Sequence, residues 1–267
     1  KIILVGDHHQ LPPLVGQDTM DEVLEEMTDP TEKADLKAIL KESIFERLFK
    51  DLPDDSKATL RIQYRMHEHI METINPFYVE KNYGLECGLT DSNKDRDHLL
   101  DGKQFKRGQH ILWYDMPNAK GYLEEREQHN RSFYNAAELA QIRTLLLDLN
   151  EATASAKQKG DLDQHVKKKV GVISFYGEQV KKVDRMLSQE LDLPHLHTRT
   201  GTVDKFQGME MDVIILSFVR NHLQPDANIG FLKDYRRLNV ALSRARELLM
   251  IVGSVDMFTQ KALKEPQ

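Results

Sequence analysis

Four short segments of the chain carry side chains that suit the binding of phosphate groups. The first, residues 6–13, follows an apolar run and contains Gln10, whose amide can orient a water molecule or contact a terminal phosphate. The second, residues 63–67, places Tyr64 beside Arg65 just before an apolar helix. A guanidinium is planar, always charged and able to bind phosphate with two hydrogen bonds, and a tyrosine ring can stack on a base. Taken singly, each segment also fits an ordinary polar turn.

The third segment, residues 201–212, is a polar run directly before a buried strand. Gly201 and Gly208 permit tight turns and a close approach of backbone to ligand. Thr202 can donate a hydrogen bond to a phosphate, and Glu210 can accept hydrogen bonds from ribose hydroxyls. This composition favours a ligand-binding loop over a simple connection.

The fourth segment, residues 235–246, has apolar residues at helical spacing. Arg237 and Arg244 are seven residues apart, so on one helix they would be nearly aligned at the margin of the buried stripe. An arginine there can point into a cleft between domains, although a solvated side chain is the alternative for either one alone. Four such segments in one chain argue against coincidence.

The elements between these segments predict an α/β fold. Apolar runs at 2–5, 170–175, 213–219 and 249–252 read as strands buried on both faces, and helices are predicted at 136–149, 178–191 and 238–248. Strands that alternate with helices indicate an open, mainly parallel sheet flanked by helices. Because ligands of such sheets collect at the carboxyl ends of strands, we expect Arg65 and Arg244 to converge on that edge.

The remaining stretches are predicted with less regular structure. Residues 18–50 read as acidic helix interrupted at Pro30, 51–56 as a linker, 60–78 as a strand end, turn and amphipathic helix, 84–108 as surface loop, 111–114 as a short strand, and 151–169 as a solvated loop.

Composition narrows the class of protein. Hydrophobic residues make up 40% and charged residues 30%, as in ordinary globular domains, and the net charge of −6 alone argues weakly against nucleic acid. Cys87 is the single cysteine, which excludes an internal disulfide and fits a reducing, cytoplasmic setting. No apolar run approaches the ~20 residues of a membrane span. His67 and His69 do not share a helix face, so no metal site is predicted there.

These segments, in this order, resemble motifs III, IV, V and VI of superfamily 1B helicases, in the branch of the nonsense-mediated-decay helicase and its relatives. The matching residues are 6–13, 63–67, 203–212 with the Ile-Ile-Leu-Ser that follows, and 238–246. Residues 172–176 resemble the family's intervening motif, with Ser174 where threonine is usual and Phe175 where proline is usual. The resemblance implies a three-layer RecA-like domain of the P-loop NTPase fold, the second helicase domain.

The resemblance also implies a role for each matching residue. Gln10 would sense the γ-phosphate of ATP, and Arg65 and Arg244 would be two arginine fingers, so these three residues are the predicted catalytic set. The predicted nucleotide-binding residues are Gln63, Tyr64, Gly208, Glu210 and Arg237. The predicted contacts to the sugar–phosphate backbone of single-stranded RNA or DNA are Ser174, Tyr176, Thr202 and Val203.

What the sequence lacks shapes the remaining expectation. It contains no Gly-x-x-x-x-Gly-Lys-Ser/Thr phosphate loop. In the family this loop and the Asp-Glu pair that holds Mg²⁺ lie upstream, in the first RecA-like domain. We therefore expect residues 1–58 to be a remnant of that domain, and residues 59–267 to be the second RecA-like domain. The parent protein would be an ATP-dependent helicase, and this chain alone would be inactive.

Two other classes stay open. The chain could be a non-catalytic nucleic-acid- or protein-binding module derived from a helicase, but the presence of Gln10, Arg65, Glu210 and Arg244 speaks against it. A nuclease would need clustered acidic residues and lysine around a metal, and no such cluster stands out from the scattered charges.

Overall fold

The computed structural model describes residues 2–12, 29, 31, 43–79, 84–224 and 228–261. The chain divides into two compact units, Lys1–Leu60 and Arg61–Gln267. The division falls two residues beyond the boundary expected between 58 and 59. That the first unit is a remnant of a first RecA-like domain stays a prediction.

In the first unit the described helix is α3, Ile44–Asp51, whose N-terminus is capped by the Ser43 hydroxyl accepting from Glu46 N at 3.0 Å. The strand predicted at 2–5 is wrong: these residues form no strand, and Ile2 and Val5 are 85% and 89% exposed. An apolar run becomes a buried strand only when neighbouring strands take up its N–H and C=O groups, and no described residue of this unit forms one. Most of the helices predicted over 18–50 lie outside the described residues.

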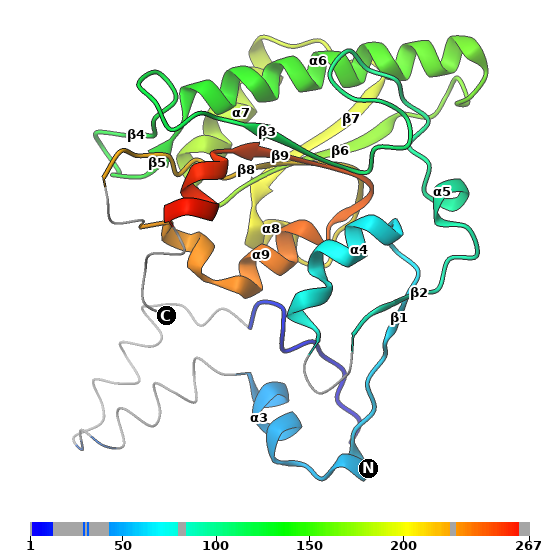
Figure 1. Cartoon of the computed structure of the whole chain (residues 1–267), viewed down its shortest axis with the longest axis vertical. Coiled ribbons are helices and arrows are strands. Elements are labelled where there is room, and N and C mark those ends of the chain that lie inside the picture. Colours follow the sequence, from blue (N-terminus) through cyan, green and yellow to red (C-terminus); the bar gives the residue numbers. More distant parts are fainter. Residues whose placement is uncertain are drawn as a thin grey trace. The chain divides into compact units, whose positions relative to one another are not determined.

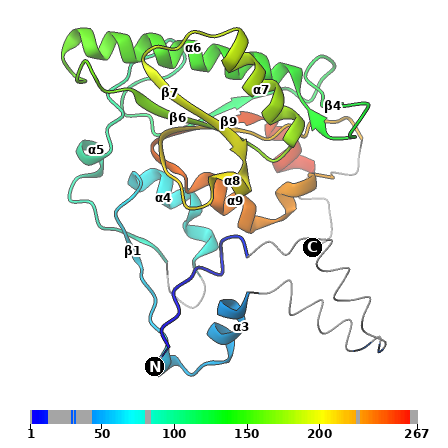
Figure 2. The same cartoon turned by 180° about the vertical axis from the view of Figure 1, so that it is seen from behind.

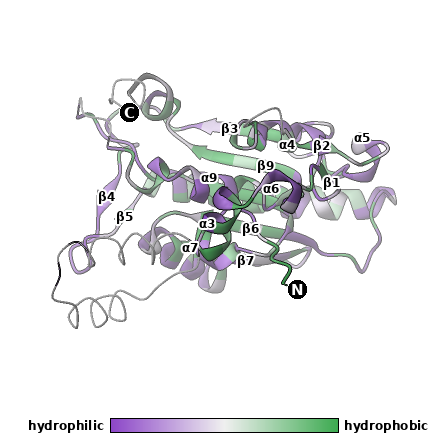
Figure 3. Ribbon diagram, turned by 90° about the horizontal axis from the view of Figure 1, so that it is seen from below, coloured by the Kyte–Doolittle hydropathy of each residue, from purple (hydrophilic) through white to green (hydrophobic). Residues whose placement is uncertain are grey.

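The second unit is built on a sheet of five parallel strands in the order β3-β9-β8-β6-β7 (Figure 1). The strands are β3 Ile111–Asp115, β6 Lys168–Ser174, β7 Leu196–Thr202, β8 Met211–Ser217 and β9 Ala245–Gly253. The three inner strands are apolar on both faces because helices cover both faces. Figure 3 shows this hydrophobic character along β9, in contrast with the hydrophilic β4.

Helices form the outer two layers of this unit (Figures 1 and 2). One face is covered by α6, Ala136–Lys159, and α7, Gly177–Gln189. The other is covered by α4, Glu68–Ile74, α8, Val203–Phe206, and α9, Tyr235–Leu242. The predicted three-layer α/β fold with a parallel central sheet is confirmed.

The smaller elements lie outside the central sheet. They are η1 Asp54–Ser56, the parallel pair β1 Ile62–Gln63 and β2 Glu86–Cys87, η2 Asn75–Phe77, α5 Ser92–Asp95, the antiparallel pair β4 Glu125–Arg126 and β5 Phe133–Tyr134, η3 Gly230–Lys233, and η4 Met257–Lys261.

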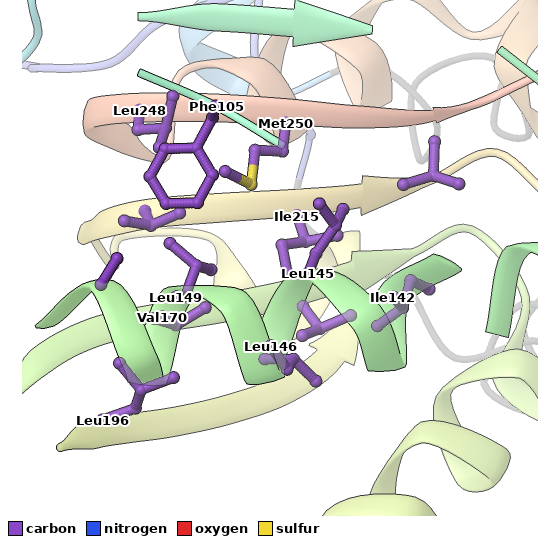
Figure 4. Packing of buried hydrophobic residues seen from close by; sticks show 14 of the residues in the cluster. Phe105, Ile142, Leu145, Leu146, Leu149, Val170, Leu196, Ile215, Leu248 and Met250 are labelled. Carbon is purple, nitrogen blue, oxygen red and sulfur yellow. The ribbon is translucent and has the colours of Figure 1, made fainter. Parts of the chain in front are cut away.

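The larger core lies between α6 and the sheet. Leu145 and Leu149 point from α6 toward Ile215 of β8 and Met250 of β9, and all four are fully buried (Figure 4). Each such side chain contributes roughly 1.5–3 kcal/mol by burial. This packing fixes the strands, and with them the loops at both edges of the sheet.

Several predicted boundaries were wrong. The loop predicted over 151–169 is helix as far as Lys159, because Ala152 and Ala156 continue the buried stripe of α6. Alanine is too weakly apolar for the stripe to stand out in the sequence. The helix ends at Gly160, whose φ of +82° suits a left-handed cap, and β6 begins at Lys168.

Two further elements differ from the sequence prediction. The helix expected over 238–248 ends at Leu242, and β9 already begins at Ala245. The polar edge strand β7 was not predicted, because one of its sides has no neighbour and its residues are largely hydrophilic. Within the predicted surface loop 84–108, Leu100 and Phe105 are buried in the core.

Candidate functional site

Arg65 and Arg244 do come together, but at the opposite edge of the sheet from the one predicted. Glu210 and Arg244 immediately precede β8 and β9, so both lie at the amino ends of the strands. Arg65 Nε lies 3.2 Å from Glu210 Oε2, and Arg65 Nη1 donates to Ser243 O at 3.4 Å. The predicted carboxyl edge was wrong because α9 ends early, and the chain has already returned to the amino edge at Arg244.

Gln63 positions Arg65 by bracing the turn between β1 and α4. Its Oε1 accepts from Arg65 N and Met66 N, both at 2.9 Å, and its Nε2 donates to Met66 O at 3.0 Å. The Gln63 amide also lies 3.7 Å from Cys87 Sγ on the paired strand β2. The Arg65 side chain keeps 36% of its surface exposed, and the neighbouring Tyr64 is 61% exposed. The turn therefore offers a cation and an aromatic face to solvent.

Arg244, by contrast, is buried. Its Nε donates to Val240 O at 2.9 Å, Nη1 to Met209 O at 3.1 Å, and Nη2 to Ser243 Oγ at 2.9 Å. A guanidinium is always charged, so these three acceptors replace the water that would otherwise solvate it. The side chain ties the end of α9 to the loop that leads into β8.

Glu210 lies between two arginines at this edge. Besides Arg65, it lies 4.0 Å from Arg246 Nη1, which in turn lies 3.8 Å from Asp212. The Glu210 side chain is 48% exposed, so water screens these pairs and each stabilises the fold only weakly. The preceding Gly208 has a φ of +78°, which fits its predicted role as a turn residue. We name Arg65, Glu210, Arg244 and Arg246 the amino-edge cluster.

Stacked histidines lie next to the amino-edge cluster. The His67 ring lies 3.4 Å from the His110 ring, its Nδ1 accepts from His69 N, and His67 N donates to Arg246 O. Burial, followed by the nearby His110, lowers the pKa of His67 to about 4. The neutral imidazole thus caps α4. In the described parts of the chain, no group of three or more His, Cys, Asp or Glu side chains is arranged to hold a metal ion.

The residues predicted to contact single-stranded RNA or DNA lie at the carboxyl edge of the sheet. Ser174 ends β6 and is in register with Thr202 of β7 and Ser217 of β8. Of the four predicted residues, Ser174, Tyr176 and Val203 are buried and Thr202 is half-buried. Ser174 Oγ accepts from Tyr176 N at 3.4 Å. The carboxyl edge therefore presents Thr202 over a buried support.

A buried polar network that the sequence analysis missed holds this edge. Glu138 Oε1 accepts from Val219 N at 2.8 Å, and Glu138 Oε2 accepts from Ser217 Oγ at 2.6 Å. Asn135 caps α6 and donates to Val219 O at 3.2 Å. Burial raises the pKa of Glu138 to about 8. Val219 has a φ of +70°, a costly conformation for a β-branched residue, which this network maintains.

The remaining predicted residues are Arg237, in the second unit, and Gln10, in the first. Arg237 sits in the first turn of α9, where Nη1 lies 3.2 Å from Asp204 and the guanidinium lies 5.5 Å from the Phe231 ring. The predicted alignment of Arg237 with Arg244 on one helix is wrong, because α9 ends between them. Gln10 belongs to the first unit, where its Nε2 donates to Asp7 at 2.7 Å.

Comparison with known proteins finds related sequences over most of the chain. Residues 40–256 match the family described as AAA domain, AAA_12. An uncharacterized ATP-dependent helicase of Methanocaldococcus jannaschii is 30% identical over 97% of this chain and 33% of its own length. The DNA polymerase alpha-associated DNA helicase A of Saccharomyces cerevisiae is 30% identical over 96% of this chain and 34% of its own length.

One solved structure, the C-terminal domain of a possible DNA helicase from Lactobacillus plantarum, aligns over 72% of this chain and 88% of that chain. The TM-score is 0.31 at 14% identity, too low to support a conclusion.

The fold and its sequence relatives define a superfamily 1B helicase-like C-terminal domain. The chain belongs to the AAA_12 family. It spans about a third of the length of the two helicases named above. None of the helices in the described residues is long and apolar enough to cross a membrane.

Proposed function

We propose that this chain is the C-terminal motor domain of an ATP-dependent helicase. Its amino-edge cluster would contact ATP bound by a first RecA-like domain, and its carboxyl edge would contact a single strand of RNA or DNA. One observation carries the proposal: Arg65, Glu210 and Arg244, from three distant segments, meet at one edge of the sheet. ATP-dependent helicases among the relatives support it. The parent protein would act inside the cell.

Arg65 is the cation best placed to reach a nucleotide. Its guanidinium is exposed on one side, and its partner Glu210 is a half-exposed carboxylate that holds it weakly. On nucleotide binding, Arg65 would exchange Glu210 for phosphate oxygens, and Glu210 would turn to the ribose hydroxyls. An arginine finger that neutralises charge in the transition state accelerates hydrolysis by roughly 10³–10⁵.

Arg244 would act as the second finger only after a rearrangement. Its three hydrogen bonds to Val240, Met209 and Ser243 would have to open before it reached a phosphate. Because the same bonds hold the end of α9 and the loop before β8, this exchange would couple nucleotide binding to the position of α9. Such coupling is what a motor needs to convert hydrolysis into altered grip on a strand.

The proposal assigns no Mg²⁺ site to this chain. The described residues offer no acidic cluster suited to Mg²⁺, so no step of the proposal passes through a metal held by this chain. The sequence also lacks a phosphate loop. We therefore propose that the chain by itself does not hydrolyse ATP.

The test is the ATPase activity of the full-length parent protein, stimulated by single-stranded RNA or DNA. Arg65→Ala and Arg244→Ala should each lower kcat by about 10³. Arg61→Ala is the matched control, because Arg61 is an exposed arginine of the same segment that pairs with Glu86. A loss of less than tenfold for both finger variants would refute the assignment.

The burial of Arg244 favours a second candidate, a non-catalytic strand-binding module in which this arginine is purely structural. That candidate predicts a parent protein that binds single strands without any strand-stimulated ATPase. The same assay therefore separates the two functions.

A further inference from the structure

A pocket of about 490 Å³ opens at the carboxyl edge, next to the predicted strand contacts. Its walls include Glu124, Arg126 and Phe133, from β4, β5 and the turn before them, and Arg220 and His222, which follow β8. The volume lies within the range of small-ligand sites. None of these residues has a role in the proposed function as stated so far.

Two cations of the pocket pack against one aromatic ring, Phe133. The guanidinium carbon of Arg220 lies 4.5 Å from the Phe133 ring centroid, and that of Arg126 lies 4.6 Å from it. The Tyr176 and Phe133 rings form a T-shaped contact with a centroid distance of 5.7 Å. Tyr176 lies two residues beyond the end of β6, so the pocket adjoins the strand ends that carry Ser174 and Thr202.

One of the two cations is fixed. Arg220 is 6% exposed and its Nε lies 3.0 Å from Glu124 Oε2, which also accepts from Asn221 N at 2.6 Å. Asn221 donates in turn to the backbone oxygens of Pro117 and Tyr122. The strained Val219, held by Glu138, sets the direction in which Arg220 leaves β8. Arg220 thus forms a rigid floor beneath Phe133.

The other cation is loosely held. Arg126 is exposed, and no carboxylate of the described residues pairs with it. A cation–π contact at an exposed site contributes only about 0.5–1 kcal/mol, so Arg126 can leave the ring at small cost. The face of Phe133 that Arg126 covers is therefore available to a planar ligand.

The charge of the pocket favours a base over a phosphate. Arg220 is neutralised by Glu124, whereas no carboxylate of the described residues pairs with Arg126. Because Glu124 and Arg220 neutralise each other, this part of the wall has no net charge to attract a phosphate, whereas a neutral aromatic base needs none. Stacking on an aromatic side chain contributes about 1–3 kcal/mol per base and is tolerant of sequence.

We propose that this pocket receives one unstacked base of the single strand. The base stacks on Phe133 in the place of Arg126, and Arg126 swings out to pair with a phosphate of the same strand. This inference deepens the proposed function, because it rests on a strand lying along the carboxyl edge. It assigns the grip on the strand to Phe133 and Arg126 in addition to Thr202.

The experiment measures binding of the nucleotide-free, full-length parent protein to fluorescent single-stranded oligonucleotides, in DNA and RNA arms. A second probe of the same length consists of abasic sugar–phosphate. Phe133→Ala should weaken binding of the normal strand about tenfold and leave the abasic probe unchanged, while Phe133→Tyr should retain binding. Thr202→Val should weaken binding of both probes, because its contact is with the backbone.

Arg126→Ala tests the same site without disturbing buried packing. It should weaken binding of both probes and reduce the dependence of affinity on salt by about one phosphate contact. An equal loss of both probes with Phe133→Ala, or loss of binding with Phe133→Tyr, would overturn the inference. So would AMP binding that depends on Phe133 while the oligonucleotides remain unaffected. If the unmodified protein binds neither probe, the proposed function itself fails.

Discussion

The amino and carboxyl edges of the central sheet differ in the chemistry of their side chains. The amino-edge cluster consists of charged side chains that partly neutralise one another, with Arg65 and Glu210 still in contact with water. The carboxyl edge has hydroxyls in register, a buried network around Glu138, and a ring against which Arg126 and Arg220 pack. Under the proposed function, exchangeable ion pairs would suit a nucleotide that binds and leaves in each cycle. A fixed, largely neutral surface would suit the contact with a nucleic-acid strand.

The comparison is sharpest at the two arginines of the amino edge. Arg244→Ala should cost about 3 kcal/mol of unfolding free energy as well as activity, because it removes the buried guanidinium that donates to the carbonyls of Val240 and Met209. Arg65→Ala should cost less than about 1 kcal/mol, because its pair with Glu210 is solvated. Urea unfolding of both variants, beside the ATPase assay, measures the difference. Equal losses of stability would contradict the assignment of Arg244 as a buried structural residue and of Arg65 as an accessible one.

Removing the buried carboxylate should damage the carboxyl edge alone. Glu138→Ala removes the acceptor of both Val219 N and the Ser217 hydroxyl and should cost about 2–4 kcal/mol of stability, with weaker strand binding. Glu138→Gln keeps an acceptor of the same shape and is the control. Where the Ala variant still folds, its nucleotide affinity should be unchanged. A parallel loss of nucleotide affinity would show that the two edges are not independent.

The two edges should respond to pH with opposite signs. Burial lowers the pKa of His67 and of His98 to about 4, so the unfolded chain takes up protons first as the pH falls below about 6.5. Each histidine should remove about 1 kcal/mol of stability by pH 5.5. Burial raises the pKa of Glu138 to about 8, so its contribution is present at low pH and is lost as the pH rises from 4.5 to 8.

Urea unfolding as a function of pH tests these signs. His98→Phe should reduce the loss of unfolding free energy as the pH falls below about 6.5, even if it lowers stability at every pH. Glu138→Gln should reduce the loss of unfolding free energy as the pH rises from 4.5 to 8. His165→Asn, at an exposed position, is the control and should change neither. If stability falls as steeply below pH 6.5 in His98→Phe as in the unmodified protein, His98 does not cause the loss of stability at acid pH.

Substitution of two glycines, one near each edge, should have the smallest effects on stability, and the two variants can be compared directly. Gly208→Ala at the amino edge meets no atom within 4 Å and should cost about 1 kcal/mol, from its φ of +78° alone. Gly230→Ala has a φ of +62° and would also place Cβ 2.2 Å from Tyr176 Oη. It should cost more, and it should weaken strand binding by disturbing the pocket wall. Equal thermal shifts for the two would argue against a tight carboxyl edge.

The sequence predicted the architecture of the second unit, but not the edge of the sheet at which Arg65 and Arg244 lie. Apolar runs marked the inner strands, because strands buried on both faces need continuous hydrophobicity. The order of motifs brought Arg65 and Arg244 into one hypothesis. The edge was missed because it depends on where α9 ends, and helix boundaries depend on tertiary packing that single-residue propensities do not contain.

The pocket around Phe133 could not have been predicted from spacing. Arg126 and Arg220 are far apart in the chain and meet only because β4–β5 and the loop after β8 fold to the same edge. The helix that carries Glu138 was predicted over 136–149. The Glu138 carboxylate was not recognisable as buried, because its partners Ser217 and Val219 belong to a distant strand.

The contact between Cys87 and Gln63 has a practical consequence. The single thiol of the chain is partly accessible and lies beside the amide that shapes the turn carrying Arg65. A small environment-sensitive dye attached there would report movement of that turn without the removal of competing cysteines from this chain. The molecule thus carries an attachment point at which the proposed binding and release of nucleotide could be followed in real time.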